Sequence, residues 1–98
     1  MDKHKLGEQA QRGERAKELL NNDLLNKWWE SSEKGLFRRF QAADMSDRDE
    51  LLKIKALSDA QLSMKADFKR YASEGDAARS RLSQDAEAQK LGKTPQTI

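Results

Sequence analysis

Two amphipathic helical patterns separated by a short polar break constrain this chain more than any other feature. Apolar residues recur every three or four positions from residue 22 to 43 and again from 47 to 73. This spacing keeps one stripe of a helix facing one partner. The break at 44–47 reads Asp-Met-Ser-Asp. The sequence therefore predicts an all-α fold built on an antiparallel helical hairpin of about 22–43 and 47–73.

Capping signals mark the start of both hairpin helices. Either Asn21 or Asn22 can accept a hydrogen bond from the free amides of the first turn. Before the second helix, Ser46 with Asp49, or Asp47 with Glu50, fits a capping box. We therefore expect the chain to turn between these signals, near Met45.

The predicted turn fixes which residues face each other. Both helices rise equally per residue, so facing positions have numbers that sum to about 91. Leu36 then meets Ile54, and at the centre the small side chains of Ser32 and Ser58 allow a close approach. The predicted hairpin core consists of Leu25, Trp29, Leu36, Phe40, Leu51, Ile54, Leu57, Leu62, Phe68 and Tyr71.

The segments outside the hairpin are poor in large apolar residues. Gly7 and Gly13 lie inside a weakly helical N-terminal pattern, and each costs about 1 kcal/mol relative to alanine. Gly75 is placed to close the second hairpin helix, after Ser73, in a left-handed conformation. We therefore expect a mobile segment at 1–15, a hairpin domain at 16–75, and a thin helix with a disordered tail at 76–98. That last helix, with its alanine stripe, would pack only against another chain.

The composition argues for association and against a membrane span. The 98 residues are 36% hydrophobic and 37% charged, too few apolar residues for a multilayered core. A two-helix unit buries little surface, so a homo-oligomer is expected. No stretch approaches the roughly 20 apolar residues that a membrane span requires, and we expect no membrane partner.

The residues that usually carry catalysis or bind metals are scarce. The chain has no cysteine, and its one histidine, His4, lies in a segment expected to be mobile, where a base cannot be preorganised. No Glu-x-x-His pair or glycine-rich phosphate loop occurs, and solvation explains acidic pairs such as Glu30 with Glu33. The sequence predicts no catalytic, cofactor or metal site, and no enzyme.

The best candidates for a partner surface lie on the first hairpin helix. Neighbours on a helix point about 100° apart, so if Trp29 fills the hairpin, Trp28 lies at its margin. There Trp28 either covers Leu19 and Leu20 or anchors a partner. The residues predicted to bind a partner are Trp28, Phe37, Arg38 and Arg39.

The two arginines admit two interpretations. Together with Phe37 they resemble a basic, aromatic nucleic-acid patch, but a solvated helix C-terminus also explains them. Nineteen basic and seventeen acidic residues are spread along the chain, and no segment is a polycation. Nucleic acid is therefore the weaker of the partners considered.

Three short motifs resemble a family of small helical proteins encoded among the structural genes of tailed bacteriophages. They are Glu-Leu-Leu-Asn-Asn-Asp-Leu-Leu at 18–25, Arg-Asp-Glu-Leu at 48–51 and Ser-Glu-Gly-Asp at 73–76, and the likeness covers about residues 18–82. The resemblance implies a viral genome and a non-enzymatic accessory role near the capsid or the packaging apparatus. It also implies a location in the host cytoplasm or the virion.

The sequence and the resemblance together favour an interaction protein. It would associate with itself and bind a larger phage or host protein during virion assembly. One alternative is a nucleic-acid-handling packaging adaptor that resembles a terminase small subunit. Another is an inhibitor of a host protein.

Overall fold

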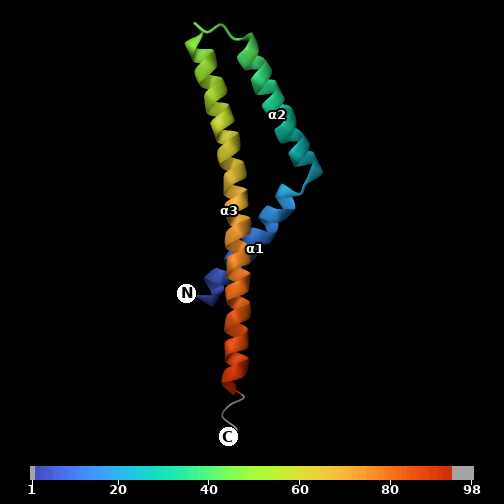
Figure 1. Cartoon of the computed structure of the whole chain (residues 1–98), viewed down its shortest axis with the longest axis vertical. Coiled ribbons are helices and arrows are strands. Elements are labelled where there is room, and N and C mark those ends of the chain that lie inside the picture. Colours follow the sequence, from blue (N-terminus) through green and yellow to red (C-terminus); the bar gives the residue numbers. More distant parts are fainter. Residues whose placement is uncertain (1, 94–98) are drawn as a thin grey trace.

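The computed structural model describes residues 2–93 as three helices with no strand among them (Figure 1). These are α1 (Lys3–Leu20), α2 (Asp23–Ala42) and α3 (Arg48–Lys93). The all-α prediction is confirmed. The predicted disordered tail falls largely on residues 94–98, which lie outside the described residues.

The longest helix, α3, runs through the position where the sequence predicted its end. Its 46 residues span about 69 Å, most of the 80 Å length of the molecule. Gly75 lies in the middle of α3, and no glycine of the described residues has a positive φ. The predicted closure at Gly75 is therefore wrong, because packing against another helix keeps this glycine helical.

That other helix is α1, which crosses α3 near its middle (Figure 1). Gly13 and Gly75 are both buried at the crossing. A Cβ atom added to Gly13 would lie 2.6 Å from the Cα of Gly75 and 2.8 Å from the carbonyl oxygen of Tyr71. Only glycine at these two positions permits so close an approach of two backbones.

Small and apolar side chains complete the crossing on both sides of the glycines. Leu6, Ala16 and Ala78 are 2–3% exposed. Residues 3–15, predicted to be mobile, are helical, and Leu6 and Gly13 among them are buried. Ala78, the first position of the predicted alanine stripe, is buried within its own chain, whereas Ala86 further along the stripe is exposed. The division of the chain into three domains stays a prediction.

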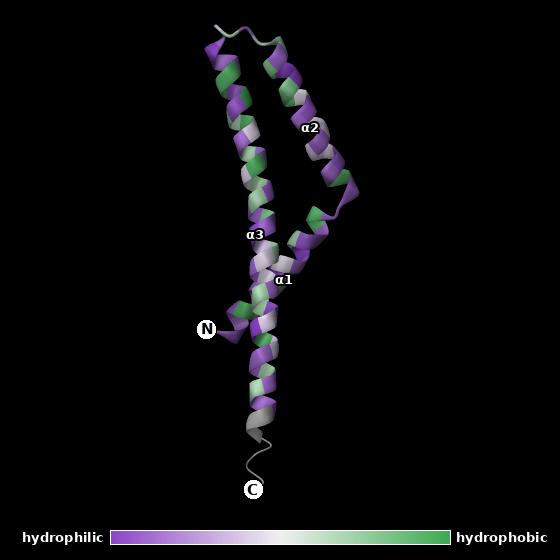
Figure 2. Ribbon diagram, in the orientation of Figure 1, coloured by the Kyte–Doolittle hydropathy of each residue, from purple (hydrophilic) through white to green (hydrophobic). Residues whose placement is uncertain are grey.

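α2 lies beside the N-terminal half of α3 and runs in the opposite direction (Figure 1). Near the turn, Arg39 reaches Glu50, and further on the amide of Gln61 donates to the Ser32 hydroxyl. The two helices diverge away from the turn. Hydrophobic residues are frequent along both, whereas the C-terminal part of α3 is more hydrophilic (Figure 2).

The predicted core of this helix pair is buried only in part. Trp29 and Ile54 are buried, with 1% and 7% exposure. Leu25, Leu36, Leu51, Phe68 and Tyr71 are half-buried, whereas Phe40, Leu57 and Leu62 are exposed. Near the turn the facing residues lie close to the predicted register, with Arg39 beside Glu50 and Ser32 beside Gln61. Further from the turn, Trp29 packs against Phe68, with ring centroids 6.1 Å apart. Tyr71 contacts α1 through Arg12 instead of Leu20.

The predicted helix starts are largely correct. The side chain of Asn22 accepts a hydrogen bond of 2.8 Å from the amide of Leu25. Asp47 accepts one of 3.2 Å from the amide of Glu50 at the start of α3. Of the two alternatives for this cap, the structure therefore has Asp47 with Glu50. The Glu50 side chain does not complete the box, because it pairs with Arg39.

Candidate protein-interaction site

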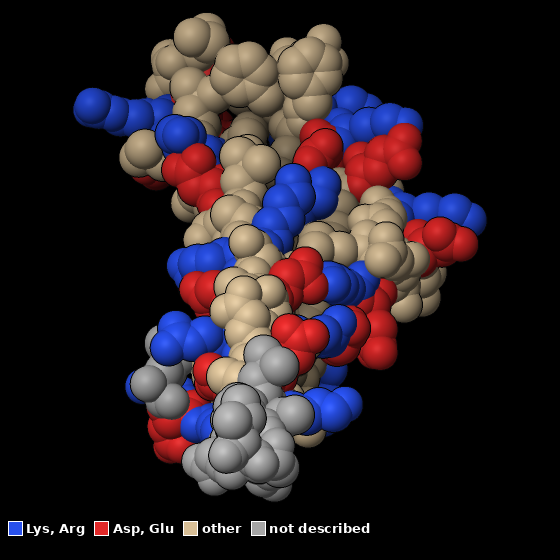
Figure 3. Space-filling view, turned by 60° about the horizontal axis from the view of Figure 1, so that its bottom comes forward, with Lys and Arg blue, Asp and Glu red and all other residues tan. Residues whose placement is uncertain are grey.

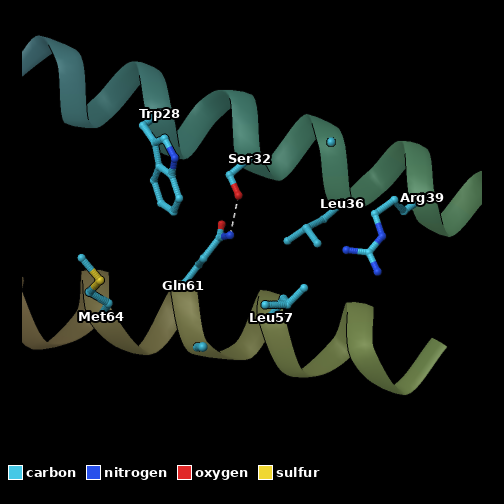
Figure 4. Close-up of a pocket in the computed structure, with 9 residues that line it drawn as sticks. Trp28, Ser32, Leu36, Arg39, Leu57, Gln61 and Met64 are labelled. Atoms are coloured by element: carbon cyan, nitrogen blue, oxygen red, sulfur yellow. Dashed lines mark hydrogen bonds between the residues drawn. The ribbon is translucent and has the colours of Figure 1, made fainter. Parts of the chain in front are cut away.

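An open groove of about 510 Å³ lies between α2 and α3. We call it the Trp28 groove (Figure 4). Its walls contain one charged residue, Arg39. The complete lining is Trp28, Ser32, Gly35, Leu36, Arg39, Leu57, Ala60, Gln61 and Met64.

Apolar side chains from both helices project into the Trp28 groove. The Trp28 ring extends from α2 toward α3 on the side of Met64, and Leu36 lies opposite Leu57 (Figure 4). Trp28 is 53% exposed, Leu57 45% and Met64 41%. Such large apolar side chains are costly to leave in water. The groove is thus a hydrophobic surface that the described chain does not cover.

Trp29, which does not line the groove, and Gln61, which does, connect α2 with α3. The Trp29 ring packs against Phe68, and the Lys65 ammonium lies 5.2 Å from the ring centroid. Two buried polar atoms have no hydrogen-bond partner, the indole Nε1 of Trp29 and the Oε1 of Gln61. An unpaired buried polar atom costs about 1–3 kcal/mol. The cost of these two unpaired atoms therefore offsets part of the stabilisation that the packing of Trp29 gives to the contact between α2 and α3.

A second concavity lies on another side of the same helix pair, and we call it the Phe37 hollow. Its volume is about 280 Å³, and its lining is Glu33, Leu36, Phe37, Phe40, Ile54 and Ser58. Phe37 is 60% exposed and Phe40 48%. Ile54 forms the buried part of this surface.

The predicted partner-binding residues do not form one patch. Trp28 and Arg39 line the groove, whereas Phe37 lines the hollow. The Nε of Arg38 donates to the carbonyl oxygen of Lys34 at 3.3 Å and lines neither concavity. The interpretation in which Trp28 covers Leu19 and Leu20 does not describe this arrangement, because Trp28 points into the groove.

Sequence reasoning missed how Gly35 and Gln61 take part in the site. Gln61 stands at a stripe position between Leu57 and Met64, and a polar residue in an apolar stripe is the signal that marks it. Gly35 carries the signal of an interior helix glycine. Leu57, predicted to be core, lines the open groove instead.

Ion pairs neutralise many of the charges around both concavities. Arg39 Nε lies 3.1 Å from a Glu50 carboxylate oxygen, and Lys65 lies 4.0 Å from Glu33. Positive and negative side chains are interspersed on the visible face (Figure 3). A phosphate backbone requires cations free to replace its counterions, and this alternation offers no continuous positive surface there.

Asp44, in the turn before α3, has a carboxyl group whose pKa is lowered. The Asp44 carboxylate accepts hydrogen bonds from the amide and the hydroxyl of Ser46, at 3.0 and 2.9 Å. These bonds lower the pKa of Asp44 below its ordinary value, with the backbone bond as the larger cause. The effect belongs to the turn and not to either concavity.

The described part of the chain shows no cluster of metal-binding side chains beside these surfaces. His4 is exposed in the first turn of α1, with its Nε2 3.1 Å from Glu8. Across residues 2–93, no three His, Cys, Asp or Glu side chains gather closely enough to hold a metal ion. Within the same residues, no helix has the length and apolar character needed to cross a membrane.

Comparisons with known proteins give no match: no family model, no curated protein and no solved structure is similar to this chain.

Proposed function

We propose that this chain is a non-enzymatic interaction protein of a tailed bacteriophage, with an accessory role in virion assembly. In this proposal α2 and the first half of α3 act as a helical hairpin whose two concavities bind other proteins. The observation that carries the proposal is the set of large apolar side chains exposed beside these concavities, including Trp28 and Phe37. Exposed apolar patches commonly mark protein interaction sites.

The two concavities suit two different partners. The Trp28 groove is wide, almost uncharged and built from both helices, which suits self-association. The Phe37 hollow is smaller, contains Glu33 and exposes two phenylalanine rings. Aromatic anchors at the centre of a polar rim are typical of contacts with a separate partner. We assign the hollow to a larger phage or host protein.

The phage setting comes from the resemblance of residues 18–82 to small proteins encoded among structural genes. Within this proposal, the resemblance implies a location in the host cytoplasm or the virion. The ion pairing of cations such as Arg39 and Lys65 favours a protein partner over nucleic acid.

Site-specific photocrosslinking in infected cells tests the assignment of the hollow. A photoreactive amino acid replaces Phe37 in one variant and Leu52 in the control. Leu52 is exposed to nearly the same extent, 59% against 60%, and lines neither concavity. We expect a defined crosslinked product with a capsid or packaging protein from position 37 and none from position 52.

Two results would contradict the proposal. One is equal crosslinking from both positions, and the other is absence of the chain from every assembly intermediate and from purified virions. DNA binding that weakens steeply with salt would instead favour the packaging adaptor, because counterion release produces such a slope.

A further inference from the structure

We propose that the occupant of the Trp28 groove is a second copy of this chain. The two copies are related by a two-fold axis that passes beside Ser32, and Trp28 of each copy packs against Gly35 of the other. The inference rests on the self-association in the proposed function and specifies its surface and geometry.

Gly35 points to a close neighbour outside its own chain. A Cβ atom added to Gly13 or Gly75 would strike backbone, so the crossing of α1 and α3 explains those two glycines. A Cβ atom added to Gly35 would meet nothing within 4 Å. An interior glycine weakens a helix relative to alanine, and no contact within the described residues repays that cost at Gly35 or at Gly7. Gly35 differs from Gly7 in its surroundings. Because Gly35 lines the groove, a second molecule that approaches α2 there would explain it.

The face of α2 that lines the groove is complementary in shape to a second copy of itself. It carries a half-exposed ring, Trp28, and an indentation, Gly35, seven residues apart on α2. Seven residues are two helical turns, or about 10.5 Å. A two-fold axis midway between them, beside Ser32, places the ring of each copy over the indentation of the other. A two-fold interface needs this property, because the same patch serves both subunits.

The same axis accounts for two further side chains. It brings Leu24 of one copy, which is 78% exposed, next to Arg39 of the other. The methylene groups of an arginine can cover an apolar side chain while its charged head stays solvated. The head of Arg39 is already paired with Glu50 of its own chain. The interface therefore brings no uncompensated like charges together.

The elongated chain exposes more surface than one standard dimer interface would cover. The accessible surface is 7811 Å². A compact monomer of 11.2 kDa exposes about 5,700 Å², so the excess of 7811 over that value is about 2,100 Å². A standard interface removes about 800 Å² from each partner. The elongated chain has surface to spare for such an interface, and the groove is its largest described concavity.

Sedimentation equilibrium of the full chain tests the indentation. We expect the wild type to be a dimer, and Gly35→Leu to raise the dimer dissociation constant at least tenfold with unchanged helical circular dichroism. Gly7→Leu is the matched control, because Gly7 also has open space around its Cβ position and lines none of the described concavities. It should leave the dissociation constant unchanged. Equal effects of the two substitutions would overturn the inference.

Disulfide crosslinking tests the axis without altering the packing, since the chain has no cysteine of its own. Ser31→Cys places a thiol beside the axis on an exposed residue, whereas Ser80→Cys places one on an exposed residue of α3 away from the groove. Under mild oxidation, we expect a covalent dimer from position 31 and none from position 80.

The outcomes separate this inference from the proposed function. A wild-type dimer that is indifferent to Gly35→Leu and does not crosslink at position 31 overturns the inference but leaves self-association intact. A monomeric wild type that still crosslinks to an assembly protein through position 37 overturns the dimer alone. A monomer with no crosslink from position 37 overturns both.

Discussion

The two helix pairs of this molecule are held together in opposite ways. Where α1 crosses α3, the backbones of Gly13 and Gly75 touch, and buried small or apolar residues surround them. Where α2 lies beside α3, the helices are bridged by long side chains, such as Gln61 reaching Ser32. The first pair is closed, and the second leaves a groove of about 510 Å³.

The difference shows that large apolar side chains do not by themselves close an interface. The aromatic residues Trp28, Phe37 and Phe40 all lie on α2, yet all are about half exposed or more. The tight crossing instead uses glycine and alanine, which let helix backbones approach. Bulky residues hold helices further apart, and without a third layer their outer sides stay in water. The closed pair, α1 with α3, therefore stabilises the fold. The open pair, α2 with α3, leaves apolar side chains available for binding.

Replacement of Trp29, the largest side chain buried between α2 and α3, should have the largest effect. Trp29→Ala should lower the free energy of unfolding by about 3–5 kcal/mol, because it removes a fully buried ring and leaves a cavity. Trp28→Ala is the matched control, and it should cost much less in dilute protein because Trp28 is 53% exposed. Urea denaturation followed by circular dichroism measures both. Similar losses would show that the open pair is closed in solution.

A methyl group at the backbone crossing should have the next largest effect. Gly13→Ala would place its Cβ 2.6 Å from the Cα of Gly75, and such overpacking typically costs about 1–3 kcal/mol. Gly7→Ala should instead stabilise the chain by up to about 1 kcal/mol, because its Cβ has open space and alanine favours the helix. Thermal unfolding should show shifts of opposite sign. A rise in the unfolding temperature of both variants would mean that the two backbones at the crossing lie further apart than described.

Ion pairs across the crossing should contribute less. Arg12 lies 3.0 Å from Glu74, and Arg79 lies 2.7 Å from Glu14, with side chains that are roughly half exposed. A double-mutant cycle on Arg12 and Glu74 should give a coupling of about 0.2–1 kcal/mol that shrinks as salt is added. Part of the loss in Arg12→Ala should persist at high salt, because its guanidinium also lies 4.3 Å from the centroid of the Tyr71 ring. A salt-independent coupling would contradict the pairing.

Protonation of Asp44 should have the smallest effect, felt at the turn between α2 and α3. The pKa of Asp44 is lowered in the folded chain, so its contribution to stability is present above the ordinary pKa of 3.8. That contribution is lost as the pH falls through the lower folded value. The protection of the Ser46 amide, measured as its exchange rate relative to the intrinsic rate at each pH, should therefore fall below about pH 4, and Asp44→Asn should weaken that dependence. An unchanged pH profile in Asp44→Asn would show that another group controls the turn.

Local signals in the sequence predicted the elements of the open pair well. The Asn22 and Asp47 caps, the break between them and the burial of Trp29 and Ile54 follow from neighbouring residues and helical period. The closed pair was missed because its signal is the absence of side chains. Gly13 and Gly75 look like helix breakers until each is seen to face the other.

The sequence by itself determined that the chain is helical, where α2 and α3 begin, and which residues are too apolar to prefer water. Those properties depend on capping, periodicity and side-chain chemistry within a few residues. Only the tertiary structure decided that α3 continues through Gly75, that α1 crosses it there, and that Trp28 and Phe37 face different concavities. These outcomes depend on contacts between residues about sixty positions apart and on the divergence of two helix axes, which no local pattern encodes.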